Sequence, residues 1–271
     1  MDIKKVHAVY FSPTGGTEKA VTAIAEGTGL PGERIDLTLL KNRRSFKKSF
    51  GSNELVVAGM PVYGGRIPTH LEDFFAGLKG NDTPAIAVAM YGNREYEDAL
   101  IEMKVNLEER GFKVIAGGSF IGEHTYSRKV AGGRPDVKDL AIAREFGRKA
   151  IEGIDKAISG KLVVKGNYPY IAKGDDPAKA ILGPVAAIAL ITATEDCTHC
   201  GLCVEQCPWG AITMNEALTV DYTKCLRCFR CIKVCPAGAL KINDPKYHEI
   251  IAKFEEWLGP LHKEPEMFYG E

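Results

Sequence analysis

The chain has 271 residues, of which 45% are apolar and 26% are charged, as is usual for a globular protein long enough for two domains. Its 35 Lys and Arg residues balance 35 Asp and Glu residues, so charge gives no reason to expect nucleic acid or an anionic membrane as a partner. The best candidate for a membrane span, 180–194, falls short of the roughly 18 apolar residues that a bilayer needs. The first residues do not resemble a signal peptide, so we expect a cytoplasmic protein.

The first part of the chain alternates between buried strands and amphipathic helices. Runs rich in Val, Ile and Ala predict strands at 4–11, 34–39, 54–62, 83–91 and 113–121. Helical periodicity predicts helices at 17–26, 68–78, 96–110 and 137–158, and only weakly at 41–50. Strands separated by helical crossovers predict an α/β fold, a doubly wound five-stranded parallel sheet with helices on both faces.

This alternation ends near residue 161 and predicts the division of the chain. We expect a first domain at 1–160, an interdomain connection at 161–194, a small cysteine-rich domain at 195–245, and a C-terminal helix and polar tail at 246–271. The stretch 169–191 is apolar enough to pack on a surface, so the small domain is expected to dock on the first, within one chain or in a homodimer.

All eight cysteines lie in the small domain, in two copies of one pattern. Each copy reads C-x-x-C-x-x-C-x-x-x-C-P, and the second follows the first by 28 residues. Structural zinc would not need the third cysteine of each run, and a disulfide framework would need an oxidising compartment. The pattern therefore predicts iron-sulfur clusters, with metal ligands Cys197, Cys200, Cys203, Cys207, Cys225, Cys228, Cys231 and Cys235.

The double pattern resembles that of bacterial two-cluster ferredoxins, which are small α+β domains. The resemblance implies that the fourth cysteine of each copy ligates the cluster of the opposite copy. One [4Fe-4S] cluster would take Cys197, Cys200, Cys203 and Cys235, and the other would take Cys207, Cys225, Cys228 and Cys231. The complete cysteine set makes His199 a spectator. Three basic residues lie beside the second copy: Arg227, Arg230 and Lys233. They would raise the reduction potential of the nearby cluster, dock an acidic partner or form a solvated surface.

A polar loop, Ser12-Pro13-Thr14-Gly15-Gly16-Thr17, joins the first predicted strand to the first predicted helix. Its backbone N–H groups and hydroxyls converge at a helix N-terminus, which favours an anion. A nucleoside triphosphate is disfavoured because the loop lacks a Gly-Lys-Ser/Thr ending and Glu18 follows it. The G-x-G-x-x-G match at 27–32 precedes a strand instead of a helix, so it is rejected as a dinucleotide site. The opening loop is expected to bind a monophosphate.

The opening loop resembles the S/T-x-T-G-x-T phosphate loop of flavodoxins, in a match that covers about residues 1–155. Two later stretches, 60–68 and 91–98, resemble the flavin-ring loops of that superfamily, although neither contains a tryptophan to stack on the flavin. Taken singly, their tyrosines and glycines would also suit core packing and turns. The resemblance implies the sheet order 2-1-3-4-5 and bound FMN, with cofactor-binding residues Ser12, Thr14, Gly15, Gly16, Thr17, Pro61, Val62, Tyr63, Gly64, Gly65, Tyr91, Gly92, Asn93, Arg94 and Tyr96.

Two further features are assigned to the protein surface. His124 follows the fifth predicted strand, and we expect a surface histidine there instead of a flavin contact. The basic run at 41–48 is expected to be a solvated edge, with docking of an electron donor as the alternative: Lys41, Arg43, Arg44, Lys47 and Lys48.

The whole chain resembles iron-sulfur flavoproteins in which a flavodoxin-like domain is fused to a two-cluster ferredoxin. The resemblance implies an electron-transfer protein that relays low-potential electrons between two [4Fe-4S] clusters and FMN, with a ferredoxin or a reductase as donor or acceptor. The alternative is an FMN-dependent reductase of a quinone, nitro compound or metabolite, in which Arg66 or Arg94 binds an anionic substrate. A redox sensor is a third interpretation. No catalytic residues are predicted.

Overall fold

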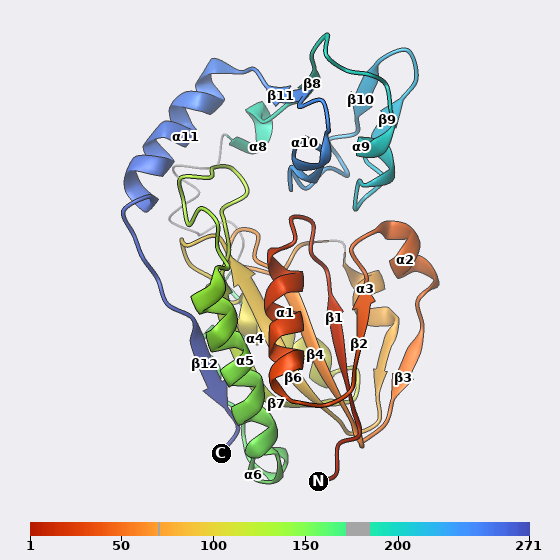
Figure 1. Cartoon of the computed structure of the whole chain (residues 1–271), viewed down its shortest axis with the longest axis vertical. Helices are drawn as coiled ribbons and strands as arrows, with labels where there is room; N and C mark the ends of the chain where they lie inside the picture. Colours follow the sequence, from red (N-terminus) through yellow and green to blue (C-terminus); the bar gives the residue numbers. More distant parts are fainter. Residues whose placement is uncertain (70, 172–184) are drawn as a thin grey trace.

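The computed structural model describes residues 1–69, 71–171 and 185–271, in which a small unit is stacked on one end of a larger α/β unit (Figure 1). Within these residues the main sheet has six strands in the order β12-β7-β6-β4-β1-β2. Its parallel strands are β1 (Lys5–Tyr10), β2 (Gly32–Asp36), β4 (Glu54–Pro61), β6 (Thr83–Tyr91) and β7 (Phe112–Ile121). Counted along the chain, these strands have the order 2-1-3-4-5, so the prediction of a flavodoxin-like doubly wound sheet is confirmed.

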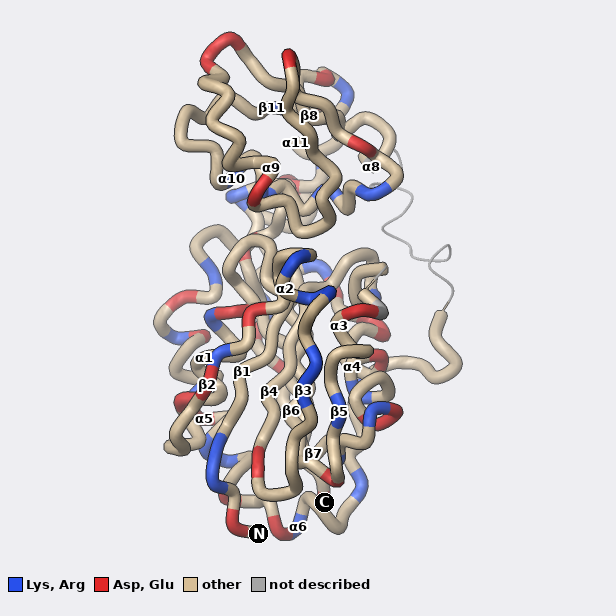
Figure 2. The backbone as a smooth tube through the Cα atoms, turned by 90° about the vertical axis from the view of Figure 1, so that its right-hand side faces the viewer, with Lys and Arg blue, Asp and Glu red and all other residues tan. Residues whose placement is uncertain are grey.

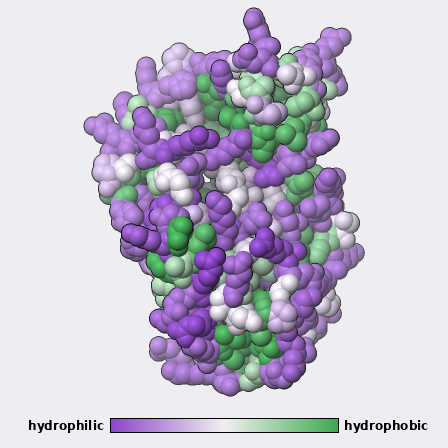
Figure 3. Space-filling view, viewed as in Figure 1, coloured by the Kyte–Doolittle hydropathy of each residue, from purple (hydrophilic) through white to green (hydrophobic). Residues whose placement is uncertain are grey.

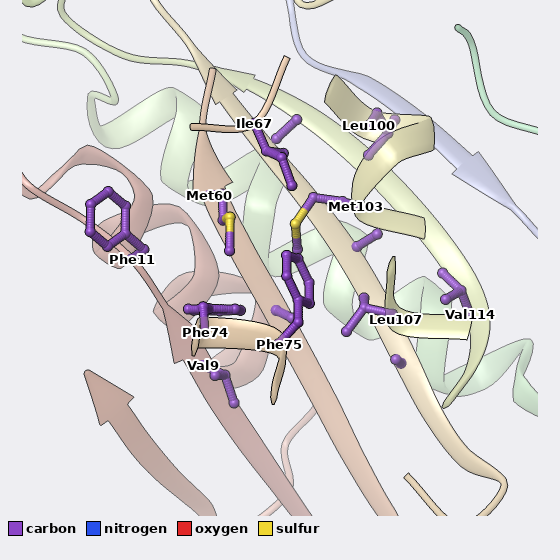
Figure 4. Close-up of a cluster of buried hydrophobic side chains, with 14 of the residues drawn as sticks. Val9, Phe11, Met60, Ile67, Phe74, Phe75, Leu100, Met103, Leu107 and Val114 are labelled. Atoms are coloured by element: carbon purple, nitrogen blue, oxygen red, sulfur yellow. The ribbon is translucent and has the colours of Figure 1, made fainter. Parts of the chain in front are cut away.

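Helices cover both faces of this sheet. On one face lie α1 (Gly16–Gly27), α5 (Val137–Glu152) and α6 (Ile154–Ser159), and on the other lie α3 (Glu72–Ala76) and α4 (Ala99–Glu108). Successive strand residues alternate between the two cores, since Val9 packs toward α3 whereas Ala8 packs toward α1. Figure 4 shows the core under α3 and α4, with Val9, Phe11, Met60, Ile67, Phe74, Phe75, Leu100, Met103, Leu107 and Val114.

Several predicted helices are shorter than the sequence pattern indicates. The region 137–158 divides at Gly153 into α5 and α6, and 68–78 contains only the single turn of α3. The weak helical pattern at 41–50 contains α2 (Leu40–Ser45) and then β3 (Lys48–Phe50), which pairs in parallel with β5 (Leu78–Gly80). Local periodicity does not reveal this small second sheet because its two strands are only three residues long.

The small unit repeats one supersecondary pattern around its cysteines. Each cysteine run leads into one short helix, α9 (Leu202–Glu205) or α10 (Arg230–Val234). Antiparallel strand pairs complete the unit: β9 (Ile212–Met214) with β10 (Leu218–Val220), and β8 (Ile191–Ala193) with β11 (Leu240–Ile242). The unit also includes α8 (Val185–Ile188). Apolar residues gather on it in the space-filling view, above a largely hydrophilic face (Figure 3).

The C-terminal segment differs from its prediction. The predicted helix is present as α11 (Pro245–Leu258), but the expected polar tail forms β12 (Glu266–Tyr269), which pairs antiparallel with β7. The Tyr269 ring packs on Phe146 of α5, with ring centroids 5.4 Å apart. The main sheet therefore gains an antiparallel edge strand, and the segment runs from the small unit back along the large one to a C-terminus near the N-terminus (Figures 1 and 2).

The predicted connection lies partly outside the described residues, which omit 172–184. Its first part is held on the large unit by Asp98, whose carboxylate accepts hydrogen bonds from the backbone N–H groups of Asn167 at 2.8 Å and Ile171 at 2.7 Å. Among the described residues no helix is long and apolar enough to cross a membrane.

Candidate functional site

A cavity of about 460 Å³ lies at the carboxyl ends of the parallel strands, beneath the small unit. Doubly wound sheets bind ligands at this edge. Loops that follow β1, β4, β6 and β7 form its wall, together with Lys233 of α10. The predicted cofactor residues that line it are Thr14, Gly16, Thr17, Pro61, Val62, Tyr63, Gly64, Gly65, Tyr91, Gly92 and Arg94.

The opening loop is shaped by Ser12 and Gly15, which themselves lie off the cavity wall. The buried Ser12 hydroxyl accepts a hydrogen bond from the backbone N–H of Glu18 at 3.0 Å, and the Ser12 N–H donates to Thr38 at 2.9 Å. Gly15 has φ +86, a left-handed conformation that glycine adopts without strain, directly before α1. Thr14, Gly16 and Thr17 are thereby presented to the cavity at the N-terminus of a helix of three turns.

The second loop is a tight turn between Tyr63 and Arg66. The Tyr63 N–H donates to the Arg66 carbonyl at 2.8 Å, and the two central residues, Gly64 and Gly65, have φ +59 and +75. Two successive positive φ angles are the requirement of a type I′ turn, which explains the Gly-Gly pair. A side chain at Gly65 would also collide with Glu97, because a Cβ there would lie 2.5 Å from its carboxylate.

The third loop connects the cavity to the C-terminal segment. Tyr91, Gly92 and Arg94 line the cavity, whereas Asn93 and Tyr96, both within the described chain, are directed elsewhere. The Asn93 side-chain amide donates to the Leu261 carbonyl at 2.8 Å, and the fully buried Tyr96 donates its hydroxyl hydrogen bond to Glu266 of β12 at 2.9 Å. Neither of these two predicted cofactor residues lines the cavity, and both side chains connect the third loop to the C-terminal segment.

The segment after β7 forms a fourth part of the wall, although none of its residues was predicted to bind the cofactor. This segment contributes Gly122, Glu123, His124, Thr125, Tyr126, Gly133 and Arg134. The wall is completed by Pro13, Lys19, Met90, Glu95 and Lys233. His124 was expected on the surface, but it faces the cavity, and burial with the cations Arg94 and Lys233 lowers its pKa to about 3. The position of 122–126 at the carboxyl end of the fifth parallel strand was the signal for this part of the site.

The cysteines form two groups in the small unit. Cys197, Cys200, Cys203 and Cys235 line one small cavity, so the fourth cysteine of the second copy lies with the first three of the first copy. Cys207 lies near Cys225, Cys228 and Cys231. Burial, and after it the neighbouring thiols of this group, raise the pKa of Cys228 to about 12 and also raise the pKa of Cys231. The two groups match the pairing implied by the ferredoxin resemblance.

The backbone of the two cysteine runs has the same shape. In the first copy His199 and Gly201 have φ +54 and +75, and in the second copy Arg227 and Phe229, at the equivalent positions, both have φ +55. Left-handed residues that alternate with right-handed ones turn backbone N–H groups into a concave nest that suits anions and iron-sulfur clusters. Equivalent hydrogen bonds also reach sulfur, from Ala211 N–H to Cys207 at 3.3 Å and from Ala239 N–H to Cys235 at 3.4 Å.

The second cysteine group faces the large cavity across the junction of the two units. Arg230, between Cys228 and Cys231, donates to the Pro13 carbonyl of the opening loop at 2.7 Å. Lys233 pairs with Glu123 on the cavity wall at 3.0 Å. The predicted basic surface beside the second copy therefore contacts the chain's own large unit through these two residues.

Arg43 strengthens the same junction and corrects the prediction of a solvated basic run. Its side chain is fully buried, donates to the Pro208 carbonyl at 2.9 Å, and lies 4.6 Å from the ring of Trp209. It also pairs with Asp73 at 3.2 Å. A docked small unit was expected, and it is held here within one chain.

Comparison with known protein families assigns the small unit. Residues 196–239 match the family described as a 4Fe-4S dicluster domain. The small unit is a 4Fe-4S dicluster domain. The chain thus joins a flavodoxin-like domain to a dicluster domain, the fused architecture expected of an iron-sulfur flavoprotein.

No curated protein matches the chain. Among solved structures it is similar to a flavodoxin from the domain Archaea, with 18% identity over 56% of this chain and 99% of that chain and a TM-score of 0.38. It is also similar to flavodoxin 1 of Bacillus cereus, with 16% identity over 55% and 98% and a TM-score of 0.38. Rubredoxin oxygen:oxidoreductase of Desulfovibrio gigas gives 13% identity over 58% and 38% and a TM-score of 0.41. The strand order, and not these likenesses, assigns the flavodoxin-like fold.

Proposed function

We propose that this protein relays low-potential electrons between two [4Fe-4S] clusters and FMN, and exchanges them with an external redox protein. FMN takes up one or two electrons and each cluster takes up one, so together they convert between one-electron and two-electron chemistry. The observation that carries the proposal is the contact between the second cysteine group and the large cavity, made by Arg230 on the Pro13 carbonyl.

The large cavity fits FMN in size and in the chemistry of its wall. Its volume of about 460 Å³ falls in the range of cofactor sites. Thr14, Gly16 and Thr17 at the N-terminus of α1 would hold the phosphate, because N–H groups and hydroxyls converge there. The glycine turn at Gly64 and Gly65 would let backbone amides approach the polar edge of the ring.

The cysteine groups fit cubane clusters in donor type and in their surroundings. A cubane takes one thiolate at each of its four irons, so its ligands do not converge on one metal ion, and within the part of the chain that the structure describes no three His, Cys, Asp or Glu side chains do so. Each cysteine group contains four thiols, and each receives a backbone N–H hydrogen bond on sulfur, from Ala211 or Ala239. Such hydrogen bonds tune the potential of a cluster.

The two clusters would have different positions in the relay. Cys228 and Cys231 of the second group are buried. Cys225 and Cys228 lie near Tyr63 of the cavity wall, and the pKa of Tyr63 is raised by burial first and also by these thiols. Cys200 of the first group is exposed. We infer that the second cluster exchanges electrons with the flavin and that the external redox protein meets the first cluster.

The alternative function, a reductase of a small acceptor, loses part of its basis. Arg66 was a candidate for binding an anionic substrate, but its guanidinium donates to both carboxylate oxygens of Glu102 and lies 4.0 Å from the ring of Tyr170. It is not among the described residues that line the cavity. Arg94 does line the cavity, where it pairs with Glu97 at 2.5 Å. The electron-transfer role is therefore the better supported.

An anaerobic reductive titration tests the relay. The purified protein is assayed for iron, sulfide and FMN, and limiting dithionite is then added while the visible spectrum is recorded. We expect both the clusters and the flavin to be reduced, because the second cysteine group adjoins the cavity. Clusters that bleach while the flavin stays oxidised would contradict the proposal.

A further inference from the structure

His124 is fixed between the cavity and the helix that follows the dicluster domain. Its imidazole packs on Phe254 of α11, with ring centroids 4.5 Å apart, and meets Tyr126 edge-on at 5.3 Å. On the other side lies Gly92, where an added Cβ would be only 2.3 Å from His124 Cδ2. Gly92 and His124 both line the cavity, and the Cδ2 edge of the imidazole ring packs against Gly92 there.

The hydrogen bond of the other ring nitrogen sets the tautomer. Nδ1 of His124 accepts from the Tyr126 backbone N–H at 3.2 Å, so Nδ1 carries no proton. The nearby charges, Arg94 and Lys233, disfavour an imidazolium, as does burial. A neutral ring with an unprotonated Nδ1 carries its proton on Nε2. Among the described residues nothing forms a hydrogen bond with Nε2, which leaves an N–H donor at the cavity wall.

We propose that His124 is a further ligand-binding residue of the cavity, whose Nε2–H donates a hydrogen bond to an acceptor atom of the bound flavin ring. This inference rests on the proposed function. The flavin ring presents carbonyl oxygens as acceptors in both oxidation states, and a hydrogen-bond donor beside one of them favours the more electron-rich, reduced ring. His124 thereby strengthens FMN binding and raises the midpoint potential of the flavin.

Three variants of the full chain, with its clusters, test this role. His124→Phe keeps an aromatic ring between Phe254 and Gly92 but removes the donor, whereas His124→Gln keeps an N–H donor. His262→Phe is the control, because His262 is 73% exposed and pairs only with Glu264 among the described residues. FMN is removed from each protein, its dissociation constant is measured by quenching of FMN fluorescence, and the flavin midpoint potential is measured after reloading.

We expect His124→Phe to raise the Kd for FMN about tenfold, as the loss of one hydrogen bond predicts, and to make the midpoint potential more negative. His124→Gln should recover most of both effects, and His262→Phe should match the unaltered protein. Unchanged affinity and potential in His124→Phe would overturn the inference, as would equal losses in the Phe and Gln variants, which would indicate packing alone. If the unaltered protein bound no FMN, the proposed function would itself fail.

Discussion

Arg43 is a fully buried cation at the junction between the flavodoxin-like domain and the dicluster domain. Its basic neighbours made a solvated edge the natural prediction, and Lys41 and Arg44 are indeed exposed. Arg43 is buried because Pro208 and Trp209, some 165 residues later in the chain, cover it. A pattern of charge in the sequence does not show which cation on a short helix faces a second domain.

For the cysteines, by contrast, the spacing predicts iron-sulfur clusters, and the ferredoxin resemblance implies how the two runs share them. Both copies of the pattern are complete, and the structure places the fourth cysteine of each copy with the first three of the other. This crossed arrangement makes a prediction that two double variants separate. Cys197→Ser with Cys235→Ser removes two ligands of one cluster, although the two residues belong to different runs. Cys228→Ser with Cys235→Ser removes one ligand from each cluster.

We expect the first double variant to retain about four iron atoms per chain, as one remaining cubane requires, and the second to retain almost none. Iron and sulfide assays on anaerobically purified proteins measure the difference. The reverse result, with iron retained only when both changes lie in the same run, would show that each run binds its own cluster.

At the scale of elements, four of the five parallel strands were predictable because each is a largely buried apolar run, as in β6, where all nine residues are buried, whereas the edge strand β2 is largely exposed. The sixth strand was not predictable. The segment of β12 has only four residues, and its pairing with β7 and the hydrogen bond from Tyr96 to Glu266 join residues that are about 150 to 170 positions apart. Short edge strands are specified by such distant partners, which local periodicity does not contain.

The tie between the third cavity loop and the C-terminal segment can be tested through Asn93. Asn93 has φ +64, so Asn93→Gly keeps the backbone conformation while removing the hydrogen bond to Leu261. We expect the free energy of unfolding to fall by about 1 to 2 kcal/mol, because the Leu258 and Leu261 carbonyls lose the side-chain amide that donates to them, and amides of β12 to exchange faster with solvent. Urea unfolding and hydrogen exchange measure the two effects.

Asp82→Gly is the matched control, since Asp82 also has a positive φ, +55, but lies on the surface. That change should alter the free energy of unfolding by less than about 0.5 kcal/mol. Equal effects of the two substitutions would mean that glycine at a positive φ, and not the lost tie, is responsible.

At the scale of the whole molecule, the dicluster domain is held over the flavodoxin-like domain by contacts from three directions. Arg43 reaches Pro208, Arg230 reaches Pro13, and the C-terminal segment returns from α11 to the main sheet (Figure 1). The sequence predicted docking from an apolar connection, most of which lies outside the described residues. The described contacts include hydrogen bonds from side chains to backbone carbonyls, which no sequence pattern predicts, and aromatic contacts such as Trp209 on Phe11 and Phe229 on Tyr126.

The most direct test of the relay is the rate of electron transfer from the clusters to the flavin. The oxidised protein is mixed anaerobically with a limiting amount of a reduced low-potential ferredoxin in a stopped-flow instrument, and the experiment is repeated over a tenfold range of protein concentration. Because the second cysteine group and the cavity belong to one chain, we predict that cluster reoxidation coincides with flavin reduction at a rate independent of protein concentration. A rate that rises in proportion to concentration, or clusters that remain reduced beside oxidised flavin, would contradict an internal relay.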